Sequence, residues 1–169
     1  MLDDDNQLQA LFSRIGQVVV FGQYLTAALQ GCCTRIFIQQ GFDEGFARAM
    51  MDHQEPETVR RTWTELMLQR FKDQPAASAP IQSLSTALDQ AAAARKELLA
   101  YRWLLESGKP AGFASYADLD GFTLDDGGVN FERLILDLAN LASALRLLAE
   151  GIETADVALL ERLWAIVKR

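Results

Sequence analysis

The chain has 169 residues, of which 50% are hydrophobic and 23% are charged. This length and composition predict one globular domain, residues 1–169, that buries its own core. The formal charge of -7 argues against broad binding to a nucleic-acid backbone, because that binding needs a basic face. Three local basic clusters could still meet a defined phosphate or an acidic partner: Arg60-Arg61, Lys96 with Arg102, and Lys168-Arg169.

The sequence predicts a protein of a reducing, cytoplasmic setting. Cys32 and Cys33 are adjacent, which disfavours a structural disulfide between them. No basic segment followed by an apolar run opens the chain. The longest uninterrupted apolar stretch is far shorter than the roughly 20 residues that a bilayer requires. We therefore expect no membrane association.

Apolar residues recur with a helical period along almost the whole chain, which predicts an all-α fold. The first helix is expected to begin near Asp3 and to run to about Gln39, with an apolar seam spaced by steps of three and four. Three glycines within it predict a bend or a close approach of another helix: Gly16, Gly22 and Gly31. At its length this helix would be on the order of 50 Å long if unbroken.

The remaining segments predict an antiparallel bundle of about five helices with one long loop. The loop is long enough for a functional role or a small hairpin. The expected segments are a short helix carrying Phe46, Met50 and Met51, a helix over 57–71, a connector over 73–80, a central helix over 81–107, the loop over 108–129, a helix that Asn130 caps and that ends at Gly151, and a last helix capped by Thr154.

Metal and nucleophilic chemistry are disfavoured. The single histidine, His53, cannot supply the usual zinc ligand set, and no paired Glu-x-x-His sequence is present. An acidic run around Gly121 fails the calcium-loop register, since Tyr116 would take the first ligand position. No base stands ready for a serine or cysteine nucleophile. We expect no metal and no cofactor.

The central helix places Arg95 and Arg102 within an otherwise apolar, alanine-rich stretch. A buried guanidinium without partners costs several kcal/mol, so these arginines predict either a paired structural site or a ligand site. Pairing with Glu65, Glu106 or Asp137 would make the site structural. A free arginine could instead bind a phosphate or a nucleotide.

The segment Ala94 to Trp103 resembles the signature helix of HEPN-like proteins, which are small prokaryotic helical bundles often found in toxin, defence and nucleotide-transfer systems. In the active ribonucleases of that family, an arginine followed by a polar residue stands shortly before a histidine. Arg95 matches the arginine and Lys96 takes the polar position, whereas Ala100 or Tyr101 stands where the histidine belongs. The resemblance therefore implies a degenerate member that keeps the bundle and a dimer face without the catalytic histidine.

Three functional hypotheses follow from these patterns. The first is a non-catalytic interaction protein that self-associates or docks to a protein partner, which the resemblance would place in a prokaryotic or phage defence or toxin-antitoxin setting. Its expected contact residues lie in the long loop: Phe113, Tyr116 and Phe122. The second is an RNA-cleaving or nucleotide-modifying enzyme that uses the remnant motif across a dimer interface: Arg95, Lys96, Tyr101 and Arg102. The third is a small-ligand pocket between helices, lined by Trp63, Trp103 and phenylalanines.

Overall fold

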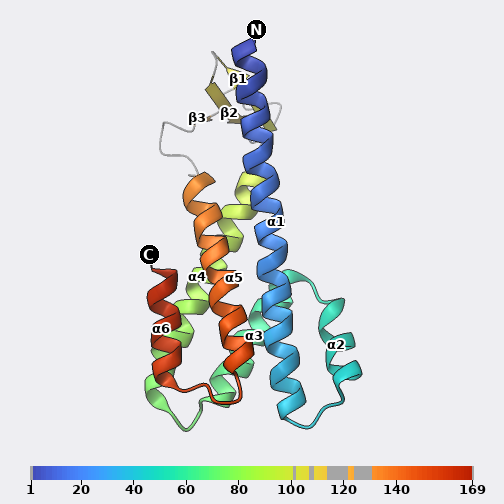
Figure 1. Ribbon diagram of the computed structural model, residues 1–169, viewed down its shortest axis with the longest axis vertical. Helices are drawn as coiled ribbons and strands as arrows, with labels where there is room; N and C mark the ends of the chain where they lie inside the picture. Colours follow the sequence, from blue (N-terminus) through green and yellow to red (C-terminus); the bar gives the residue numbers. More distant parts are fainter. Residues whose placement is uncertain (1, 101, 107–108, 114–121, 124–130, 169) are drawn as a thin grey trace.

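The structure, a computed structural model, describes the backbone of residues 2–100, 102–106, 109–113, 122–123 and 131–168. Side chains are described for residues 6, 9–100 and 131–168. The fold is an all-α bundle, as predicted, with a small sheet at one end (Figure 1). Its helices are α1 (Leu2–Gln39), α2 (Glu44–Asp52), α3 (Pro56–Arg70), α4 (Ser78–Ala100), α5 (Phe131–Gly151) and α6 (Val157–Val167), with a short 3-10 turn at Pro75–Ala77.

Successive helices alternate in direction, so that α1, α3 and α5 run one way and α2, α4 and α6 run the other way (Figure 1). The long helix α1 packs along α5 in its most extensive contact, and it also contacts α2, α3 and α4. Because α1 and α5 run parallel, their C-terminal ends lie at the same end of the bundle. The remaining helices all pack against α1 or α5.

The predicted central helix over 81–107 is wrong at its C-terminal end. Helix α4 ends at Ala100, and the chain continues as strands β1 (Arg102–Glu106), β2 (Lys109–Phe113) and β3 (Phe122–Thr123). β1 pairs antiparallel with β2, with Glu106 opposite Lys109, so a Ser-Gly dipeptide separates the two strands. A two-residue connection containing glycine is typical of a hairpin, and its pairing outweighs the helical period of the leucines in β1. The hairpin thus begins inside the segment that was expected to be helix.

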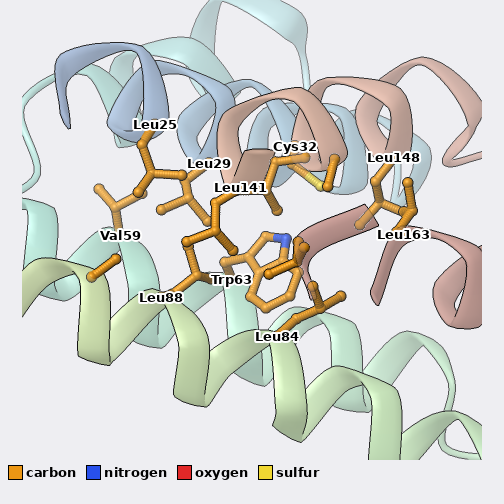
Figure 2. Packing of buried hydrophobic residues seen from close by; sticks show 14 of the residues in the cluster. Leu25, Leu29, Cys32, Val59, Trp63, Leu84, Leu88, Leu141, Leu148 and Leu163 are labelled. Atoms are coloured by element: carbon orange, nitrogen blue, oxygen red, sulfur yellow. The ribbon is translucent and has the colours of Figure 1, made fainter. Parts of the chain in front are cut away.

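The core is one continuous cluster, centred on Trp63 of α3. Figure 2 shows the Trp63 ring enclosed by Cys32 from α1, Leu84 and Leu88 from α4, and Leu141 from α5. Trp63 has no exposed surface. Removing such a side chain from water is worth several kcal/mol, so these contacts fix the helices around α1.

Local hydrogen bonds fix the C-terminal end of α1, where the chain turns toward α2. Gly41 has a φ of 95°, and the Phe42 amide donates to the Phe37 carbonyl at 3.1 Å while the Gly41 amide donates to the Ile38 carbonyl at 2.9 Å. This pattern is a Schellman cap, which favours glycine at the left-handed position. The ring of Phe42 packs edge-on against Phe37, with centroids 5.6 Å apart. Helix α1 therefore stops where the sequence predicts it.

The cap of the last helix differs from the expected one. Asp156, rather than Thr154, is the N-cap of α6, and its carboxylate accepts a hydrogen bond of 2.8 Å from the Leu159 amide. Thr154 belongs to the turn after α5, where its amide donates to the Gly151 carbonyl. Both residue types cap helices well, and the carboxylate adds a favourable interaction with the helix dipole.

Arg70, at the end of α3, connects the C-terminal ends of α1 and α5. Its guanidinium donates to the Gln39 side chain at 2.7 Å, to the Ile152 carbonyl, and to the Glu153 carbonyl at 3.3 Å. Carbonyls at a helix C-terminus lack partners within the helix, and a cation there also offsets the negative end of the helix dipole. One side chain thereby stabilises two helix ends.

We predict that Arg70→Ala lowers the free energy of unfolding by about 2 kcal/mol, because it removes charge-assisted bonds and leaves carbonyls unpaired. Arg61→Ala is the matched control: Arg61 is exposed, and among the described side chains it pairs with Glu65 alone, at 3.9 Å. That change should cost less than about 0.5 kcal/mol. Urea denaturation measures both values. Equal effects of the two substitutions would contradict this role of Arg70.

Candidate functional site

Two of the three expected partners of Arg95 pair with other arginines. Arg95 lies on α4, half-buried, against Gly22 of α1. Its Nε atom is buried and has no hydrogen-bond partner in the part of the chain that the structure describes. The expected partners are engaged elsewhere, since Glu65 pairs with Arg61 at 3.9 Å and Asp137 pairs with Arg133 at 2.9 Å. The third expected partner, Glu106, lies in β1, where side chains are not described.

Gly22 accounts for the close contact between α1 and α4. A Cβ atom at this position would lie 2.7 Å from Cδ of Arg95 and closer still to its Nε. The absence of a side chain therefore lets the arginine stem pass directly over the α1 backbone. Of the expected effects of glycines in α1, close helix approach is thus confirmed at Gly22.

The other residues of the remnant motif are not on one helix. Lys96 is exposed on α4, whereas Arg102 is in β1 and Tyr101 lies outside the described residues. The segment that resembles the HEPN signature helix is therefore divided between a helix and a strand. The expectation that Arg102 lies in the same helix as Arg95 is wrong, because α4 ends at Ala100.

The predicted contact residues of the long loop are mostly in the sheet. Phe113 is in β2 opposite Arg102, and Phe122 is in β3 opposite Gly112. Tyr116 lies outside the described residues. The sheet has the order β1-β2-β3 and lies beside the N-terminal half of α1 (Figure 1).

The predicted tryptophan-lined pocket is wrong for Trp63, which is wholly buried in the core. Trp103 lies in β1, where side chains are not described. A different tryptophan, Trp164 of α6, borders a cleft of about 490 Å³ between α4, α5 and α6. The Lys168 ammonium lies 5.0 Å from the centre of the Trp164 ring, so a cation from this chain already occupies the ring face.

His53 ends α2 and is exposed. Within the described residues, no three histidine, cysteine, aspartate or glutamate side chains gather as a metal site would require.

Both cysteines are buried. Burial raises the pKa of Cys32 to about 12, and the Trp63 N–H with two arginines offsets only part of this effect. Burial and the neighbouring Cys32 raise the pKa of Cys33 as well. Both groups are therefore neutral, unreactive thiols near pH 7.

Helix α1 is apolar on its outer side as well as on its core side. Between Arg14 and Gln39, the sole charged residue is Arg35. One side carries the buried seam from Leu11 to Ile36. The other side carries a second row, which we call the outward stripe: Val20, Tyr24, Ala27, Gly31 and Ile38. All five are exposed, and Tyr24 has 60% of its surface open to solvent.

Three residues of the outward stripe, Tyr24, Ala27 and Gly31, border a groove between α1 and α5 with a volume of about 600 Å³. Small residues form much of its surface on both helices: Ala27, Ala28, Gly31, Ala139, Ala142, Ser143 and Ala149. Phe21 and Tyr24 form one end of the groove, with ring centroids 6.1 Å apart in an edge-on arrangement. Two leucines of α5 are also exposed: Leu136 and Leu147.

A second cavity, of about 340 Å³, continues from the first toward the C-terminal end of α1. The two cavities share Gly31 and Arg35. The second one is bordered by Ile38 and by residues of α2 and of the chain after α5. We call the two together the α1 groove. Its sequence signal is the second row of apolar and small residues on α1, on the face opposite the buried seam.

No family model matches this chain, and no curated protein or solved structure is similar to it. The resemblance to HEPN-like proteins therefore stays a prediction. In the described part of the chain, no helix combines the length and the hydropathy needed to cross a membrane.

We predict that Gly22→Ala and Arg95→Ala are energetically coupled. Alanine in a helix is about 1 kcal/mol more favourable than glycine, so Gly22→Ala should stabilise the Arg95→Ala background by roughly that amount. In the presence of Arg95 the new methyl group displaces the guanidinium stem, and the gain should disappear or reverse. Urea denaturation of the four proteins measures the coupling.

Gly16→Ala is the control, because outside the local helix backbone no atom of the described residues lies within 4 Å of a Cβ at Gly16. It should have the same effect on stability whether residue 95 is arginine or not. If Gly22→Ala also has equal effects in both backgrounds, then Arg95 does not lie on Gly22.

Proposed function

We propose that the protein is a non-catalytic interaction module whose α1 groove takes a helix of a partner protein. The observation that carries this proposal is the second apolar face of α1. A row of apolar residues along one face of a helix is normally covered, yet the outward stripe is exposed in this chain. A partner surface would complete its burial.

The shape of the groove suits a helix. Residues of the outward stripe follow one another by steps of four, three, four and seven, which is the spacing of a helix-packing seam. Ala27 and Gly31 allow the axis of a second helix to come close. From Phe21 to Gln39 the groove runs for about 27 Å, the length of a helix of about 18 residues.

A partner of different sequence fits the charges better than a second copy does. The outward stripe and the rest of α1 from Ile15 to Gln39 contain no carboxylate. The same stretch of a second α1 could therefore not neutralise Arg35 when placed against it. Each copy also carries a formal charge of -7, which opposes self-association at low salt.

The alternative of an Arg95 enzyme lacks an acid–base partner. Among the residues with described side chains, Arg95 makes no hydrogen bond through Nε, and the single histidine, His53, follows the end of α2. Tyrosine has an unperturbed pKa near 10, so Tyr101 would be a poor base at neutral pH. The exposed apolar stripe gives docking the stronger physical support.

We predict that Gly31→Leu abolishes the binding of helical peptides in the α1 groove. The probe is a displayed library of 20-residue peptides with leucine or alanine at the two seam positions of each heptad and random residues elsewhere. Wild-type protein should enrich this library over one that holds the same apolar residues in strand-like alternation. Outside the local helix backbone, no atom of the described residues lies within 4 Å of a Cβ at Gly31, so the leucine should leave the fold intact and fill the groove.

Gln82→Leu is the matched control, since Gln82 is exposed on α4 away from the groove. It should leave the enrichment unchanged. Equal enrichment of the two libraries, or full binding by Gly31→Leu, would contradict the proposal. A dimer in sedimentation equilibrium that Gly31→Leu dissociates would show that the occupant is a second copy and not a partner helix.

A further inference from the structure

Arg35 occupies the point where the two cavities of the α1 groove meet. It borders both cavities, and it is exposed on the side of α1 that faces α5. At about 1.5 Å per residue, it lies roughly 21 Å from the Phe21 end of the groove and about 6 Å from the Gln39 end. A helix lying in the groove would therefore meet Arg35 within the last turn or two at one of its own ends.

Three arginines border the α1 groove, and Arg35 is the one without an ion pair among the residues whose side chains are described. Arg48 pairs with Glu44 at 2.8 Å, and Arg146 pairs with Glu150 at 3.8 Å, each pair within one helix. Arg35 makes no ion pair and no hydrogen bond with the residues whose side chains are described. A docking helix would remove water from this guanidinium, which favours a carboxylate placed to receive its paired N–H groups.

Resting on the proposed function, we infer that the partner helix carries an aspartate or glutamate in its first turn and docks antiparallel to α1, with that carboxylate on Arg35. Carboxylates are favoured in the first turn of a helix, where they offset the positive end of its dipole. The same end of the groove holds the C-termini of both α1 and α5, whose dipoles are negative there (Figure 1). Both effects favour the N-terminus of the partner helix at this end.

The experiment uses the peptide probe in two forms. Each peptide has the same leucine and alanine seam and one aspartate, placed either in the first turn or in the last turn. We expect the first-turn peptide to bind at least fivefold more tightly by fluorescence anisotropy, and Arg35→Glu to remove that preference. A first-turn lysine should then bind Arg35→Glu better than the aspartate does, which a purely structural role of Arg35 would not produce.

Arg146→Glu is the control for general charge effects, because Arg146 already has a carboxylate partner. It should weaken the first-turn peptide much less than Arg35→Glu does. A preference for the last-turn aspartate would overturn the antiparallel orientation. If Arg35→Glu leaves binding unchanged while Gly31→Leu abolishes it, the inference fails and the proposed function stands. If neither substitution changes binding, both fail.

Discussion

The burial of α1 is the constraint on which the rest of the structure depends. This helix carries one charged residue between Arg14 and Gln39, so it can be stable in water only if other elements cover it. Helices α2, α3, α4 and α5 cover its core side, and Trp63 fills the space between them. Gly22 lets α4 approach, and Arg70 secures the ends of α1 and α5. The outward stripe is the part of α1 that these contacts leave uncovered.

Local chemistry made much of the fold predictable. Gly41 and the Asp43 side chain mark the end of α1 and the start of α2, and Pro56 marks the first turn of α3, because their effects depend only on nearby residues. The end of α4 could not be read in the same way. Leu105 of β1 keeps the helical spacing of seven residues from Leu98, and strand pairing with β2 decides its structure.

The candidate site was less predictable because the most conspicuous charges are not at the exposed apolar surface. Arg95 stood out within an alanine-rich stretch, yet its stem passes over Gly22 between two helices. Arg35 attracted no notice, because a single arginine on a long helix is ordinary. The tertiary fold places it between two cavities, with no ion pair to any residue whose side chain is described. Periodicity identified the buried seam of α1, but only the packing of α5 and α2 shows which opposite residues border a groove.

The most direct test of helix docking in the α1 groove is a solution NMR titration of the labelled protein with the first-turn aspartate peptide. Helix docking predicts chemical-shift changes that cluster at Val20, Tyr24 and Gly31 on α1 and at Ser143 on α5. Changes centred instead on the cleft beside Trp164, or on α4 around Arg95, would contradict it.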